Sequence, residues 1–104
     1  MDTKRLEKLQ KSLAAHPADA FTRYLVALEL VKLNQPEEAL AHFHQLHSEH
    51  AAYVPTYYQY AQLLESLGRR AEAIAVYREG VGVARQAGDG HAASELQAAL
   101  DLLE

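Results

Sequence analysis

Apolar residues recur three or four positions apart along most of this chain, and this spacing places them on one face of an α-helix. The stretch DAFTRYLVALELVKL has its large apolar side chains at Phe21, Tyr24, Leu25, Leu28 and Val31. Residues 3–15 carry a stripe of leucines, and HAASELQAALDLL carries a comparable stripe near the end of the sequence. The pattern therefore predicts a chain composed mainly of amphipathic helices.

The chain also repeats itself at an offset of 34 residues. The pairs that align are Tyr24 with Tyr58, Ala27 with Ala61, Leu30 with Leu64, Leu33 with Leu67, Glu38 with Glu72, Ala39 with Ala73, Leu40 with Ile74 and Phe43 with Tyr77. Asn34 falls opposite Gly68, and both residue types tolerate the left-handed conformation that ends many helices. Pro36 then suits the first turn of a following helix. Each repeat is thus predicted to be two helices joined by a turn.

With these residues the chain resembles the tetratricopeptide repeat family, whose unit of about 34 residues is a helix–turn–helix. The family places small residues at two packing positions, which are Ala27 and Ala39 in the first repeat. Small side chains let the two helices approach closely. The resemblance covers residues 18–87 and is to a small bacterial-type protein with two repeats.

Departures from the family pattern carry predictions of their own. The aromatic residue of the fourth position is Arg23 in the first repeat and Tyr57 in the second. The proline near the end of the unit is replaced by Arg85 in the second repeat, so we expect that helix to continue to about Gly88. Gly80 aligns with a small-residue position, which favours close helix packing over a nucleotide-binding loop.

The resemblance and the helical stripes together predict one all-α domain over residues 1–104. We expect a right-handed α–α superhelix of about six helices, arranged as a cap, two tetratricopeptide-type helix hairpins and a second cap. The expected segments are an N-terminal cap helix at 3–16, repeat 1 at 18–51, repeat 2 at 52–87 and a C-terminal cap helix at 90–104. The two caps would cover the open ends of the stacked repeats.

In the resembling family, ligands bind in a concave groove lined by the first helix of each pair. The groove positions in this chain are Phe21, Tyr24, Leu28, Val31, Pro55, Tyr58, Gln62 and Glu65. The resemblance implies a non-catalytic interaction module or scaffold that binds a peptide, a helix or a second copy of itself there. The groove lacks the cationic clamp that would hold an acidic peptide. One alternative stays open, in which a cap helix fills the groove and makes Phe21 and Tyr24 part of the core.

The segment HFHQLHSEH, residues 42–50, contains four histidines and suggests a different class of function. No two of them have the i,i+4 spacing with which two histidines of one helix chelate zinc, so His44, His47 and His50 are only weak candidates for metal ligands. The helical register predicts that His42 and His44 lie at solvated edges, whereas His47 and His50 are partly packed. The alternative function is therefore a metal- or pH-responsive protein.

Composition and charge remove several other classes of function. The chain has 104 residues and a net charge of −4. It has no cysteine, so disulfides and thiolate metal sites are excluded. No apolar stretch approaches the roughly 18 residues of a membrane span, and the N-terminus has no apolar leader, so we expect a cytoplasmic protein without membrane contact. The sequence has no basic patch of the kind that binds nucleic acid, so we expect no nucleic-acid partner. No nucleophile faces a base, so we predict neither an enzyme nor a cofactor.

Overall fold

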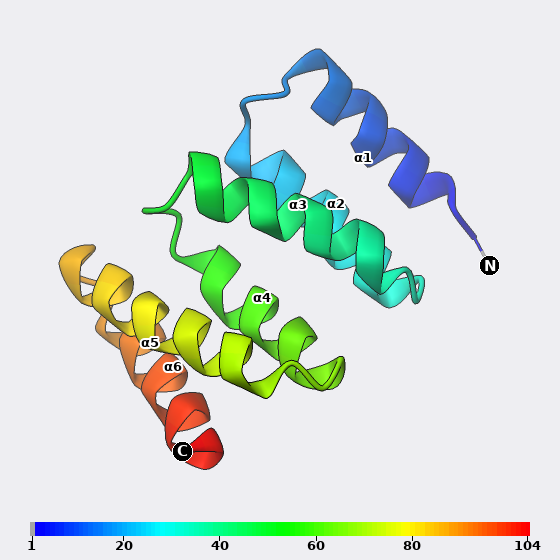
Figure 1. The fold of residues 1–104 in the computed structure, drawn as a ribbon. Coiled ribbons are helices and arrows are strands. Elements are labelled where there is room, and N and C mark those ends of the chain that lie inside the picture. Colours follow the sequence, from blue (N-terminus) through cyan, green and yellow to red (C-terminus); the bar gives the residue numbers. More distant parts are fainter. Residues whose placement is uncertain (1) are drawn as a thin grey trace. The chain divides into compact units, whose positions relative to one another are not determined.

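The computed structural model describes residues 2–104, which form six α-helices and no strand (Figure 1). The helices are α1 (Lys4–Ala15), α2 (Ala20–Lys32), α3 (Pro36–Glu49), α4 (Pro55–Ser66), α5 (Arg70–Gln86) and α6 (Gly90–Leu103). The predicted all-α class is confirmed. Within the described part of the chain, none of these helices combines the length and the apolar character that crossing a membrane requires.

The chain divides into two compact units, Met1–His50 with α1 to α3 and Ala51–Glu104 with α4 to α6. The division falls next to the predicted boundary between the two repeats, so each unit holds one helix hairpin and one further helix. The single domain expected from the sequence stays a prediction.

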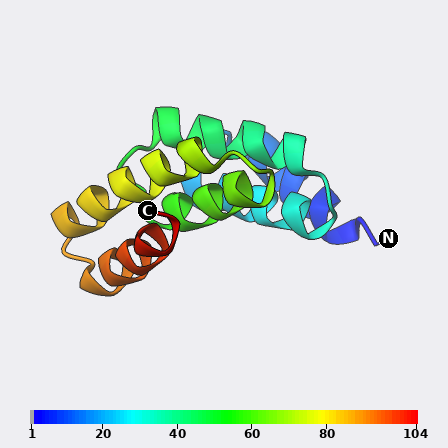
Figure 2. The same cartoon turned by 60° about the horizontal axis from the view of Figure 1, so that its bottom comes forward.

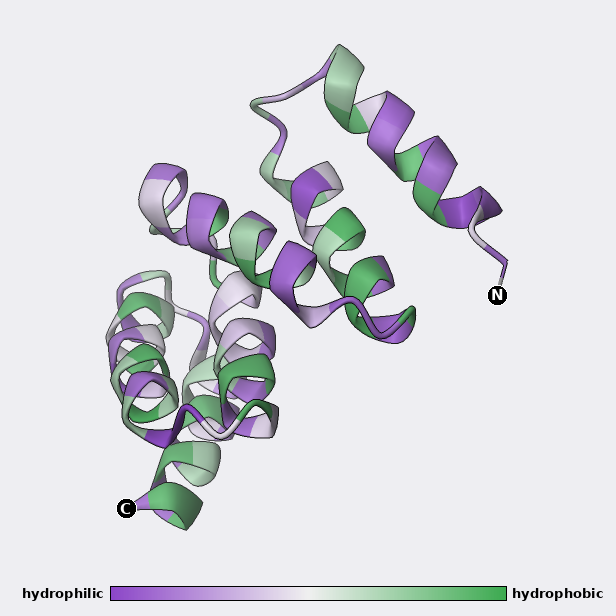
Figure 3. Cartoon of the chain, turned by 45° about the vertical axis from the view of Figure 1, so that its right-hand side comes forward, coloured by the Kyte–Doolittle hydropathy of each residue, from purple (hydrophilic) through white to green (hydrophobic). Residues whose placement is uncertain are grey.

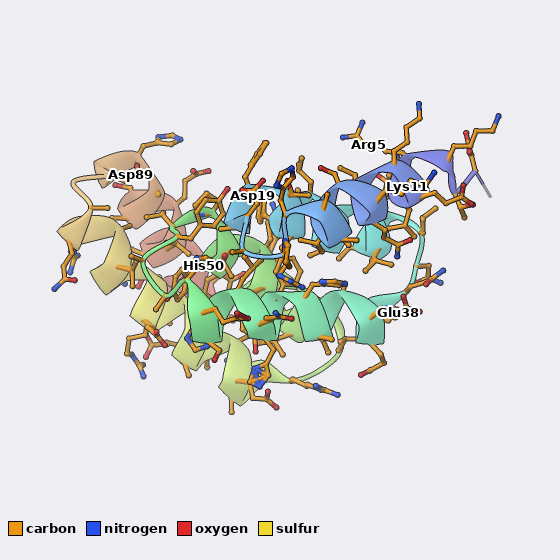
Figure 4. The ribbon with its side chains drawn as sticks, turned by 90° about the horizontal axis from the view of Figure 1, so that it is seen from above. Arg5, Lys11, Asp19, Glu38, His50 and Asp89 are labelled. Carbon is orange, nitrogen blue, oxygen red and sulfur yellow. The ribbon has the colours of Figure 1, made fainter. Side chains whose placement is uncertain are left out.

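In the first unit, α2 pairs with α3, and α1 packs on α2 (Figures 1 and 2). Ala27 and Ala39 are fully buried, as the small-residue positions predicted, and the unit's larger core residues include Phe43. The apolar residues of α1 lie along one side of that helix (Figure 3). On α1, Arg5 also forms an ion pair, with 3.2 Å between its Nε and Oε1 of the buried Glu29 of α2 (Figure 4).

In the second unit, α5 packs against both α4 and α6 (Figure 2). Gly80 marks a close approach of these helices, because a Cβ atom at this position would lie 2.7 Å from Cβ of Tyr57 and 3.2 Å from Cδ1 of Leu96. A carbon–carbon contact of 2.7 Å is far inside the optimal separation of about 3.5–4.0 Å. The predicted close helix contact at Gly80 is therefore confirmed.

Three helices end with the same left-handed turn. The residues with positive φ are Asn34 (59°), Gly68 (76°) and Gly88 (73°). After each of them, the next backbone N–H donates to a carbonyl five residues earlier, and these bonds of 2.9 Å join Gln35 to Leu30, Arg69 to Leu64 and Asp89 to Ala84. This bond is the mark of the Schellman motif, which satisfies a carbonyl that the helix end leaves free. The turns predicted at Asn34 and Gly68 are confirmed.

The second helix of the second repeat is longer than that of the first. Helix α5 has 17 residues and α3 has 14. The extension predicted from Arg85, which stands where the repeat pattern has proline, is confirmed, with the left-handed turn at Gly88. Asp89 then caps α6, because its Oδ1 accepts a hydrogen bond of 3.0 Å from the backbone N–H of Ala92.

Arg23 replaces an aromatic residue of the repeat pattern but makes the same kind of contact. The hydroxyl of Tyr57 donates to the carbonyl oxygen of Ala51, and 34 residues earlier Nη2 of Arg23 donates to the carbonyl oxygen of Pro17 at 3.1 Å. Nη1 of the buried Arg23 also lies 3.1 Å from Nδ1 of His42. Because a guanidinium group can only donate, Nδ1 of His42 accepts, and this imidazole is neutral with its proton on Nε2.

Candidate functional site

The first helix of the second repeat presents three of the predicted groove residues to one pocket. Tyr58, Gln62 and Glu65 are spaced i, i+4 and i+7 on α4, so they lie on one face of the helix. All three line a cavity of about 310 Å³ within the second unit. We call this cavity the α4–α6 pocket.

Helix α6 supplies the opposite wall of the α4–α6 pocket. Its lining residues are Glu95, Ala98, Ala99 and Leu102. We expected these residues to cover the end of the stack and did not predict them as part of the groove. The sequence does carry a signal for them. Because α5 is three residues longer than α3, the 34-residue period becomes 37 here. Glu95 follows Tyr58 by 37 residues, as Ala99 follows Gln62 and Leu102 follows Glu65. Helix α6 therefore takes the place that the first helix of a further repeat would have.

Tyr77 of α5 forms the inner side of the α4–α6 pocket. Its hydroxyl donates to Oε2 of Glu65 at 2.8 Å, and its ring meets that of Tyr58 edge-on, with 6.1 Å between the ring centroids and 71° between the planes. Burial and the neighbouring Glu65 carboxylate raise the pKa of Tyr77 above its usual range, so the phenol stays neutral. Glu65 and Tyr58 are thus both held in place by one buried side chain.

The α4–α6 pocket combines negative charge with apolar surface. Glu65 and Glu95 bring two carboxylates, and none of the described residues that line the pocket is cationic. Glu95 is largely exposed, and its Oε1 lies 3.2 Å from Nε2 of the exposed His91, one turn earlier on α6. Leu102 is 87% exposed, in the hydrophobic last turn of α6 that Figure 3 shows in green. Chemically, this arrangement can accept hydrogen bonds and contact aliphatic groups.

Of the other predicted groove residues, Pro55 is exposed at the start of α4 and does not line the pocket, and the remaining four lie on α2, in the first unit. Phe21 is 56% exposed and Val31 is 41% exposed, while Tyr24 and Leu28 are half-buried. Phe21 therefore lies outside the core of the first unit, contrary to the alternative that placed it there, whereas Tyr24 is partly covered. The four side chains form an apolar face that we call the α2 face.

The histidines of α3 do not form one site. His44 is exposed and His47 and His50 are half-buried, and Figure 4 shows His50 at the end of its helix. Residues 2–104 contain no group of three or more His, Asp or Glu side chains placed to hold a metal ion. The prediction that His42 lies at a solvated edge is wrong: its imidazole is half-buried because it packs against the Arg23 guanidinium. Burial, and then the charge of Arg23, lower the pKa of His42.

Comparison with known proteins supports the repeat architecture. The family profile described as tetratricopeptide repeat matches residues 30–100. A solution NMR structure of a tetratricopeptide repeat domain protein from Salinibacter ruber is 42% identical, with 85% of this chain and 89% of that chain covered and a TM-score of 0.82. A crystal structure of such a domain from the same organism is 41% identical, with 82% and 94% covered and a TM-score of 0.78.

A third similar structure shows how far the fold extends along the chain. A protein from Bordetella parapertussis is 24% identical, with 99% of this chain and 89% of that chain covered and a TM-score of 0.82. No curated protein matches the chain. The predicted helical-repeat fold is confirmed by these structures.

Proposed function

The chain belongs to the tetratricopeptide repeat family, and from this premise we propose that it is a non-catalytic module that binds another protein through the α4–α6 pocket. Membership of the family supports the general part of this function, since these domains are typically interaction scaffolds and not enzymes. The observation that carries the specific part is the convergence of Tyr58, Gln62 and Glu65 on one cavity that α6 continues.

The architecture of the α4–α6 pocket favours recognition of a protein segment. Tyrosine is enriched among the residues that dominate binding energy at protein interfaces, because it offers a large rigid surface with one polar group. The edge contact with the buried Tyr77 orients the ring of Tyr58 before a ligand arrives. Such preorganisation lowers the conformational entropy that binding would otherwise cost.

The α2 face is a second candidate surface for a peptide, a helix or a second copy of the protein. Phe21 and Val31 expose aromatic and aliphatic surface side by side with the half-buried Tyr24 and Leu28. Contiguous exposed apolar surface commonly marks a site of protein contact. Because the face carries no charge of its own, its contacts would depend on apolar burial.

Quantitative affinity capture from the source cells tests this function. The bait proteins are the wild type, Tyr58→Ala, Tyr24→Ala, the double variant, and Glu72→Ala as a control on an exposed position of α5 outside the pocket. We expect at least one partner to be retained by Glu72→Ala and lost by Tyr58→Ala, with circular dichroism showing that each bait is folded. Retention of every partner by the double variant would refute binding through these residues.

A pH-responsive function remains as the second candidate, and it now rests on His42. The neutral imidazole accepts a hydrogen bond from the buried Arg23, so a proton at Nδ1 would abolish this contact and place two cations together. Light scattering and partner binding at pH 7.5 and pH 5.5, with and without zinc, separate this candidate from the first. The cytoplasmic location expected from the sequence stays a prediction.

A further inference from the structure

The α4–α6 pocket carries a charge that none of its lining residues neutralises. Glu65 approaches it from α4 and Glu95 from α6, and none of the described residues that line the cavity is a lysine or an arginine. Two arginines of α5 bond elsewhere: Arg70 donates to the carbonyl oxygen of Leu103, and Nη2 of Arg78 lies 2.6 Å from Oε2 of Glu104. The pocket therefore has two carboxylates available to an external cation.

We propose that the α4–α6 pocket binds a lysine or arginine side chain of a partner protein. This inference rests on the function proposed above and names the chemistry of the segment that the pocket accepts. An acidic side chain in the same place would face two like charges. A purely apolar side chain would remove water from the carboxylates without replacing the lost hydrogen bonds.

Glu65 is positioned to accept a cationic donor. The Tyr77 hydroxyl donates to its Oε2, which holds the carboxylate at the pocket. A carboxylate has about four acceptor positions, so this one bond leaves room for the N–H groups of an ammonium or guanidinium ion. Hydrogen bonds between ionised partners are shorter and stronger than neutral ones.

Glu95 supplies the second carboxylate from an exposed position. Its side chain is 56% exposed, and its contact with His91 is a surface i,i+4 pair. Such exposed pairs contribute little to stability, so turning Glu95 toward a bound cation costs little. The two carboxylates can then contact one cation from opposite walls of the pocket.

The apolar part of the pocket suits the stem of the same side chain. Lysine and arginine bury their methylene groups along apolar surface while the charged end stays with polar groups. Leu102 and Ala99 of α6 offer aliphatic surface for this stem. The ring of Tyr58 adds an aromatic surface, which attracts a cation placed over its face.

Selection of peptides and measurement of their affinities test the inference. A random peptide library is selected against the wild-type protein, and the strongest binder is synthesised as selected and with its basic residue replaced by glutamine. Fluorescence polarisation then gives the Kd of both peptides for the wild type, Glu65→Gln, Glu95→Gln and the control Glu72→Gln. Glutamine keeps the shape of glutamate and can still accept from Tyr77, so only the charge changes.

We expect the selected peptides to share a lysine or arginine. Replacing this residue, or making Glu65→Gln or Glu95→Gln, should raise the Kd roughly tenfold, as loss of one charged hydrogen-bond partner does. Glu72→Gln should leave the Kd unchanged. Since Glu95 is exposed, Glu95→Gln tests the inference even if Glu65→Gln disturbs folding.

The possible contrary results are distinguishable. Peptides that share no basic residue, or that bind Glu65→Gln and Glu95→Gln as tightly as the wild type, would overturn the inference. If Tyr58→Ala still weakens the binding of these peptides, the proposed function stands although this inference fails. A library that yields no peptide whose binding depends on Tyr58 counts against both the proposed function and the inference. Light scattering could also show that the wild type is a dimer and that the variant with both Glu65→Gln and Glu95→Gln is a monomer. This result would assign the pocket to a second copy of the protein and would also overturn the inference.

Discussion

Replacing Gly80 with alanine should destabilise the second unit, whereas the same change at Gly82 should stabilise it. Both glycines lie inside α5, where alanine is favoured over glycine by about 1 kcal/mol. A Cβ atom at Gly82 meets nothing within 4 Å. We therefore expect Gly82→Ala to raise the free energy of unfolding by roughly 0.5–1 kcal/mol, the ordinary difference between these residues in a helix.

At Gly80 the added methyl group has no room. Its distance of 2.7 Å to Cβ of Tyr57 is about 0.7 Å short of the 3.4 Å at which ordinary contact begins. Leu96 can turn its terminal methyl aside, but the Tyr57 Cβ is attached directly to the backbone of α4, so the helices themselves have to separate. Overpacking of this kind costs about 1–3 kcal/mol. Over most of this range the cost is larger than the gain in helix propensity, so Gly80→Ala should lower the free energy of unfolding.

Urea and thermal unfolding of the two variants, followed by circular dichroism, measure this difference. We expect Gly82→Ala to be more stable than Gly80→Ala by about 2 kcal/mol, which corresponds to a difference in Tm of roughly 8 °C for a domain of this size. Leu96→Ala should not rescue Gly80→Ala, because the blocking atom belongs to Tyr57. If Gly80→Ala proved as stable as Gly82→Ala, the close contact between α4 and α5 would be refuted.

Three further predictions concern the polar contacts. Burial and the charge of Arg23 lower the pKa of His42 in the folded state, so the unfolded chain binds more protons than the folded one. The stability that this histidine contributes is therefore present at pH 7.5. It falls as the pH drops through the ordinary pKa of histidine, near 6.5. Urea unfolding at pH 7.5 and pH 5.5 should show a smaller loss for His42→Gln than for the wild type, and equal losses would contradict this assignment. Arg23→Leu should lower the free energy of unfolding by about 1–3 kcal/mol, because it leaves the Pro17 carbonyl without its donor; Arg23→Tyr, which introduces the aromatic residue of the repeat pattern, should recover much of this loss in the same assay. Tyr77→Phe should lower the free energy of unfolding by about 1 kcal/mol and raise the Kd of basic peptides in fluorescence polarisation, since Glu65 loses the hydrogen bond that orients it. An unchanged Kd would show that this bond does not position the carboxylate.

Much of the architecture could be predicted from the sequence because it depends on neighbouring residues. Apolar spacing indicated the helices, and the 34-residue repeat indicated how they pair. The turns at Asn34 and Gly68 followed from the few residue types that adopt a positive φ without strain. Three residues of the α4–α6 pocket were also predicted, from the groove positions of the resembling family, and their i, i+4 and i+7 spacing places them on one helix face.

The remaining features were decided by contacts between segments far apart in the chain. The length of α5 sets the register of α6, and only the packed unit shows that Glu95 and Leu102 therefore face Tyr58. The bond between Arg23 and His42 likewise joins residues of different helices, which is why helical register alone misplaced this histidine. By itself the sequence determined which residues share a helix face. The tertiary structure decided which faces meet, because that depends on packing distances that no local pattern encodes.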